Sequence, residues 1–107
     1  MLPKKNRVDK KGIALIFKKG DFTTSPIFTF KFIRIYTGER KISFIVPKNV
    51  VKLAVKRNSL RRKGYLALKK YLNQFPSGIL GVFVFKRPEE DILKIENEIK
   101  NILDKIN

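Results

Sequence analysis

The stretch AVKRNSLRRK, residues 54–63, places five cations among apolar residues and opens a helix-compatible run that extends to about Leu72. On a helix with 3.6 residues per turn, the small and apolar side chains of this run fall on one stripe, which is typical of a packing face. The stripe comprises Leu53, Leu60, Gly64, Ala67, Leu68 and Tyr71. Polar residues flank it on both sides: Lys52, Lys56, Ser59, Lys63 and Lys70 on one, and Asn58, Arg61 and Arg62 on the other. We therefore predict a helix whose apolar side packs on a core and whose cationic sides lie against phosphates.

The charge pattern of this helix favours a binding surface over an ordinary solvated face. Solvated helices usually alternate acidic and basic residues, which form ion pairs at i,i+4 spacing. The sequence has no Asp or Glu at all between Val46 and Pro88. Like charges this close repel one another, and an external anion would relieve the repulsion.

The formal net charge of the 107-residue chain is +16, and it is unevenly distributed. Residues 1–88 contain 22 Lys and Arg against 3 Asp and Glu, a net +19, whereas residues 89–107 contain 3 Lys against 6 acids, a net −3. Such a field attracts a polyanion and speeds its encounter, so nucleic acid is the expected partner. A membrane surface is not expected, because it would select a basic amphipathic terminal helix and the terminal helix here is acidic.

Composition narrows the class of protein further. The length fits one domain, residues 1–107, with a core large enough to fold without disulfides. The sequence contains no cysteine, no apolar run of membrane-spanning length and no secretory leader, so we expect a cytoplasmic protein. It also lacks histidine and a glycine-rich phosphate loop, and its early acids, Asp9, Asp21 and Glu39, are far apart. We therefore predict a binder or accessory subunit with no catalytic residue and no metal site of its own.

The N-terminal part predicts a short helix followed by a strand pair. A basic arm, residues 1–8, precedes a helix over Lys10–Lys19, for which Asp9 is the expected N-cap and Gly20 the end. Val8 and Ile13 are spaced as a hydrophobic staple around the cap. Residues 21–26 have the composition of a connection, and strands are predicted at 27–36 and 41–46.

The C-terminal part predicts one more strand and a helix. Residues 79–85 are continuously apolar, which is typical of a strand covered on both faces. A buttress helix occupies 89–107 and begins with Glu89-Glu90-Asp91, acids that suit the positive end of a helix dipole. The fold class is α+β, one sheet with helices packed on it, in the order α-β-β-(β)-α-β-α with the bracketed strand optional. The basic helix forms a crossover that would be right-handed by default.

Three aromatic residues, Phe28, Phe30 and Phe32, share one face of the first long strand. They are either a core face under a helix or a platform on which unpaired bases stack, since stacking on a ring contributes about 1–3 kcal/mol per base. Phe17 of the first helix fits either arrangement. The sequence leaves these two interpretations open.

Residues 54–62, AVKRNSLRR, resemble the signature A-V-x-R-N-x-x-[KR]-R of the bacterial ribonuclease P protein component. Residues 2–8, LPKKNRV, are similar to the family's L-x-K-x-x-R-[LV] start. Ile13 with Phe17-Lys18-Lys19-Gly20 resembles its F-x-x-[VL]-F-[KR]-x-G helix. The three motifs occur in the family's order and the likeness spans essentially the whole chain, so it is far more specific than any one motif.

The resemblance implies the protein subunit of ribonuclease P, in which an RNA subunit with Mg²⁺ removes the 5′ leader of precursor tRNA. It implies that a monomeric protein binds this RNA and the single-stranded leader, that the polypeptide alone is not catalytic, and that the crossover is left-handed. The residues it assigns to the catalytic RNA are Lys56, Arg57, Asn58, Arg61 and Arg62. We add Lys52, just before the helix, as a further cation for RNA phosphates. Those that the resemblance assigns to the leader cleft are Ile13, Phe17, Phe28 and Phe30.

The sequence departs from the family pattern at four places. Ser59 stands where many members carry a second Arg, Tyr65-Leu66 replaces an Arg-Glu pair, and one residue is added before Ala54. Ile13 replaces a ring that could stack on a base. Two other classes compete with this interpretation: an RNA-binding module of another particle, such as a ribosomal protein, and a DNA-binding protein that uses residues 52–70 as a recognition helix.

Overall fold

The computed structural model describes residues 6–106. The predicted α+β class is confirmed. Its elements, in chain order, are α1 (Lys10–Lys19), β1 (Asp21–Thr24), β2 (Phe28–Arg34), β3 (Arg40–Ile45), α2 (Ala54–Lys69), the 3-10 turn η2 (Leu72–Gln74), β4 (Ile79–Phe85) and α3 (Ile92–Ile106). Residues 1–5 of the predicted basic arm lie outside the described residues.

Four strands form one mixed sheet in the order β1-β2-β4-β3. The β3 and β4 strands are parallel neighbours with α2 between them in sequence, which confirms the crossover. The hand of this crossover stays a prediction of the resemblance.

The predicted connection at residues 21–26 is wrong in its first four residues, which form β1. This strand pairs antiparallel with β2, placing Phe22 opposite Lys31 and Thr24 opposite Thr29. A four-residue edge strand with one large apolar side chain carries little local signal, because its pairing with β2 rather than its own pattern fixes it.

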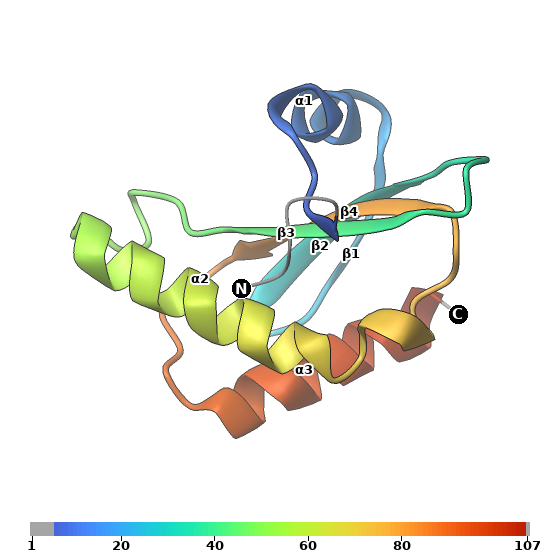
Figure 1. Cartoon of the computed structure of the whole chain (residues 1–107). Coiled ribbons are helices and arrows are strands. Elements are labelled where there is room, and N and C mark those ends of the chain that lie inside the picture. Colours follow the sequence, from blue (N-terminus) through green and yellow to red (C-terminus); the bar gives the residue numbers. More distant parts are fainter. Residues whose placement is uncertain (1–5, 107) are drawn as a thin grey trace.

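Helices cover both faces of the sheet: α1 lies on one face, and α2 and α3 lie on the other (Figure 1). The face under α2 and α3 holds the aromatic core. Phe28 and Phe30 are fully buried there, with ring centroids 5.2 and 4.4 Å from that of Phe83. Of the two interpretations left open for these rings, the core face under a helix is therefore confirmed. The assignment of Phe28 and Phe30 to the leader cleft is wrong, because helices from the second half of the chain cover the face to which they point.

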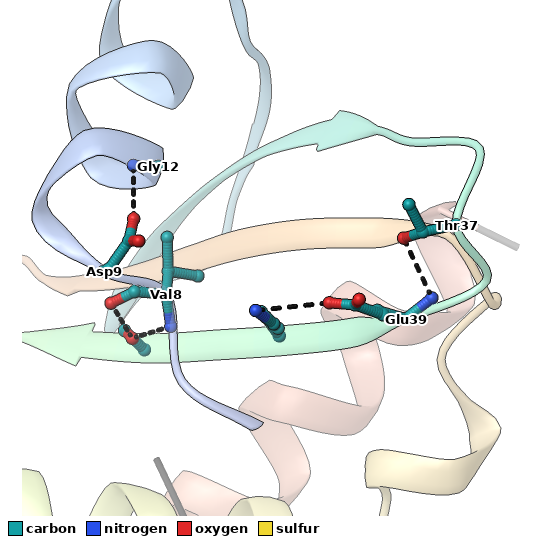
Figure 2. Close-up of polar contacts among 7 residues, drawn as sticks. Val8, Asp9, Gly12, Thr37 and Glu39 are labelled. Atoms are coloured by element: carbon teal, nitrogen blue, oxygen red, sulfur yellow. Dashed lines mark hydrogen bonds and ion pairs between the residues drawn. The ribbon is translucent and has the colours of Figure 1, made fainter. Parts of the chain in front are cut away.

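The start of α1 is fixed to β3 by side-chain hydrogen bonds (Figure 2). The Ser43 hydroxyl accepts from the Val8 amide at 2.8 Å and donates to the Val8 carbonyl at 3.3 Å. The predicted N-cap is confirmed, since the Asp9 carboxylate accepts from the Gly12 amide at 2.8 Å. Below the helix, Ile16 packs with Val8 and Val82 in a second, smaller core.

The α2 helix docks on the sheet by a narrow contact. Its buried residues are Leu60, Gly64, Tyr65, Ala67 and Leu68, so the predicted packing stripe is confirmed except that Leu53 is 62% exposed and Tyr65 was missed. A Cβ on Gly64 would stand 2.6 Å from the Phe44 ring, so only glycine lets the helix backbone come this close. Tyr65 packs edge-on against Phe44 at 5.1 Å, and its hydroxyl accepts from the Phe44 amide at 3.2 Å.

The C-terminal helix is shorter than predicted. Its three acids precede Ile92 instead of forming the first turn, and the Asp91 carboxylate accepts from the Leu93 amide at 3.0 Å. Ile95, Ile99 and Ile102 are fully buried, as their spacing predicted. Across residues 6–106, no helix is both long and apolar enough to cross a membrane.

Candidate nucleic-acid interface

The six residues predicted to bind RNA lie on α2 and its lead-in, away from the docking stripe. Arg57 and Arg61 are half-buried, and Lys52, Lys56, Asn58 and Arg62 are exposed. Within residues 6–106 there are two ion pairs, Lys41 with Glu39 and Lys70 with Glu96, and neither involves these six. None of these six residues, which we call the α2 basic surface, thus forms an ion pair with another described residue.

Arg57 also organises the chain before α2. Its Nη1 donates to the carbonyl oxygens of Val51 at 3.0 Å and Lys52 at 2.6 Å. A guanidinium carries five N–H donors, so Nη2 and Nε keep donors for a further acceptor. Arg57 can therefore hold the lead-in and contact a phosphate at once.

The N-terminus of α2 is suited to an anion. Leu53 occupies the N-cap and makes no side-chain capping bond, and the first turn contains no acid. The first amides of a helix have no intrahelical acceptor, and the helix dipole adds a partial positive charge at this end. Lys52 and Lys56 flank these amides in the sequence.

A pocket of about 560 Å³ joins the two halves of the predicted site. Its lining residues come from the start of α1, from β3 and from α2: Arg7, Val8, Asp9, Ile13, Ser43, Phe44, Ile45, Arg61 and Tyr65. The sequence assigned Ile13 to the leader and Arg61 to the catalytic RNA, and the structure brings both to this one pocket. The side chain of Asn58 accepts from Arg61 Nη2 and so restrains the guanidinium at the pocket wall.

Beside the pocket, α1 borders a row of sheet residues that no other described helix covers. Strand register places Thr24, Thr29, Val84 and Ile45 side by side across the sheet, on the face opposite to the Phe28 side. Ile13 and Phe17 lie one helical turn apart, so they project from the same side of α1. Phe17 is 45% exposed, and the Lys31 ammonium lies 4.5 Å from the centre of its ring.

Two residues of this region were not assigned from the sequence. Lys31 interrupts an apolar strand, and this isolated cation was the signal available for it. Tyr65 could not be found from helical spacing, because its role depends on an amide of β3. Phe28 and Phe30 lie outside the region, on the other face of the sheet.

Comparison with known protein families identifies the chain. The family model described as Ribonuclease P matches residues 2–107. The chain belongs to the ribonuclease P protein family. Membership places it in tRNA processing and gives it an RNA partner within a ribonucleoprotein.

Solved structures of ribonuclease P proteins share the fold. The protein from Thermotoga maritima superposes with a TM-score of 0.83 at 19% identity, over 94% of this chain and 97% of that chain. The Staphylococcus aureus protein gives a TM-score of 0.76 at 19% identity, over 97% of both chains. A comparison with curated protein sequences finds no match.

Proposed function

We propose that this ribonuclease P protein binds the RNA subunit with its α2 basic surface and the 5′ leader of precursor tRNA along the Ile13–Phe17 side of α1. The observation that carries the proposal is the division of α2 into two sides. One side is docked to the sheet through Leu60, Gly64 and Leu68, and the other presents cations without carboxylate partners in the described residues. Phosphates would supply the missing negative charge through charge-assisted hydrogen bonds.

Leader binding is supported by the chemistry along α1. The Phe17 ring offers an exposed surface for stacking, and Lys31 beside it offers a charge for a phosphate. Ile13 supplies apolar contact but no π-face. A single strand running past α1 would thus meet the Phe17 ring, the Lys31 cation and the pocket lined by Arg61.

The hydrolysis itself is proposed to belong to the RNA subunit and its Mg²⁺ ions. Within residues 6–106, no group of three or more acids, cysteines or histidines comes together that could hold a metal ion. The proposal therefore assigns no Mg²⁺ ligand to this chain. The chain would contribute affinity for substrate and charge neutralisation, as a monomer in the cytoplasm.

Reconstitution tests this function. Ribonuclease P RNA and a precursor tRNA are combined at moderate Mg²⁺ with and without the protein, and 5′-leader cleavage is timed. We expect the protein to increase the cleavage rate, and its affinity for the RNA to fall steeply with salt. Equal rates with and without the protein, or undiminished cleavage by the protein when the RNA is left out, would contradict the proposal.

A further inference from the structure

An exposed aromatic residue on the edge strand β1 has no role in the fold. Phe22 is 68% exposed and is absent from both hydrophobic cores. A large exposed ring on an edge strand favours unwanted pairing with other chains, so its presence indicates a binding role.

Strand register places Phe22 next to the Ile13–Phe17 side of α1, where the leader is proposed to bind. It lies directly opposite Lys31 in the antiparallel β1–β2 pair, so the two side chains project from the same face about 5 Å apart at their Cα atoms. That face is the α1 face, because Phe28 and Phe30, which alternate with Lys31 along β2, point into the opposite core. The Lys31 ammonium in turn lies 4.5 Å from the Phe17 ring centre.

The charge around this ring identifies the kind of partner. Lys31 neighbours both rings, since its ammonium lies over the Phe17 ring and its Cα is paired with that of Phe22. Lys18 and Lys19 occupy the last turn of α1. The acid that precedes Phe22 in the extended strand, Asp21, is paired with Phe32, so its side chain projects from the opposite face. Two rings with a cation next to both suit alternating bases and phosphates of an unpaired strand.

We propose that Phe22 is a further base-stacking residue, which takes a nucleotide of single-stranded RNA beyond the one at Phe17 while Lys31 contacts the phosphate between them. The inference rests on the proposed leader binding. It extends the path of the bound leader across the end of α1 onto β1. It predicts that this protein distinguishes longer leaders from shorter ones through an aromatic residue on β1.

The test uses the reconstituted ribonucleoprotein and precursor tRNAs whose leaders are lengthened by one nucleotide at a time. With the wild-type protein, substrate affinity should rise with each added nucleotide and then level off. Phe22→Ala should level off at a shorter leader and bind the longest leader at least about fivefold more weakly, with the shortest leader unaffected. Phe22→Tyr should retain the wild-type profile, and Phe22→Leu should behave as the alanine variant, because stacking requires a π-face.

A matched control is available on the far side of the molecule. Leu93 of α3 is 69% exposed, so Leu93→Ala removes an equally accessible apolar side chain and should leave the leader profile unchanged. Both alanine variants should keep the melting temperature within about 4 °C, because surface substitutions seldom change stability by much.

A second readout does not depend on cleavage. The sequence contains no tryptophan, so Phe22→Trp introduces a single indole. Its fluorescence should be quenched on adding an unstructured RNA oligonucleotide, whereas that of Leu93→Trp should not.

The outcomes separate the two proposals. If the wild-type protein shows no dependence on leader length, leader binding itself is wrong. If that dependence is present and Phe22→Ala retains it in full, with no quenching of Phe22→Trp, the inference about Phe22 alone is overturned. It is also overturned if the wild-type protein sediments as a dimer that Phe22→Ala dissociates, since the ring would then contact a second copy of the chain.

Discussion

Removing the Arg62 guanidinium should weaken RNA binding without affecting the fold. The Arg62 side chain is exposed on α2 and makes no hydrogen bond or ion pair with residues 6–106. Arg62→Ala should therefore change the free energy of unfolding by less than about 0.5 kcal/mol. A charged hydrogen bond to a phosphate contributes about 1.5–3 kcal/mol, so affinity for ribonuclease P RNA should fall by about 10-fold to about 150-fold. The slope of log affinity against log salt should decrease by about 0.7–0.9.

Two matched variants make the measurement specific. Lys94→Ala removes the same unit of charge from an exposed position on α3, and it should leave affinity and salt slope nearly unchanged. Arg57→Ala should lower RNA affinity and also destabilise the fold by about 1 kcal/mol, because the carbonyls of Val51 and Lys52 lose their donor. Affinities are read from filter binding over a salt series, and stabilities from urea unfolding.

The comparison can refute the reasoning in two ways. If Arg62→Ala and Lys94→Ala weaken RNA binding equally, the effect is one of overall charge and α2 is not the interface. If Arg62→Ala unfolds at clearly lower urea than the wild type, Arg62 has a structural partner and its exposed position has been misread.

Substitutions at three further positions test how α2 is docked and capped. Tyr65→Phe removes the acceptor for the buried Phe44 amide and should cost about 1–3 kcal/mol in urea unfolding, and an unchanged midpoint would show that water replaces the hydroxyl. Gly64→Ala brings a methyl group to 2.6 Å from the Phe44 ring. The overpacking should cost about 1–3 kcal/mol and outweigh the gain of about 1 kcal/mol in helix propensity, so the free energy of unfolding should fall. A net rise in stability would mean that the ring moves aside. Leu53→Ser and Leu53→Asp should each add a side-chain N-cap, contributing about 0.5–2 kcal/mol, but only the aspartate should weaken RNA binding. Equal affinities for these two variants would exclude an anion at this helix end.

The elements with strong local signals were predicted to the residue. Lys10–Lys19 and Ile79–Phe85 have the predicted bounds, because a capping acid and Gly20 delimit the first and a continuous apolar run defines the second. The α2 helix was predicted to reach about Leu72 and ends at Lys69, with η2 after it. The β1 strand could not be recognised, since pairing with β2 rather than its own four residues determines it.

The cationic part of the candidate site could be predicted from the sequence. The part that depends on which face of the sheet is covered by helices could not. The α2 cations were found from the absence of acids around them. Alternation along β2 correctly separated Phe28 and Phe30 from Lys31, but it could not say which face a helix would cover. The covered face is set by α2 and α3, whose apolar sides bury the face that carries Phe28 and Phe30. Lys31 therefore remains on the accessible face, and the two rings do not.

The two RNA-facing surfaces proposed for this chain both contact β3. Arg61 on α2 and Ile13 on α1 line one pocket with this strand between them. Ser43 holds the start of α1 through both backbone polar atoms of Val8, and the next residue, Phe44, holds α2 through the Tyr65 hydroxyl. One edge strand thus fixes a helix on each face of the sheet. The relative position of the two helices, and with it the pocket between the two proposed surfaces, therefore depends on the adjacent residues Ser43 and Phe44.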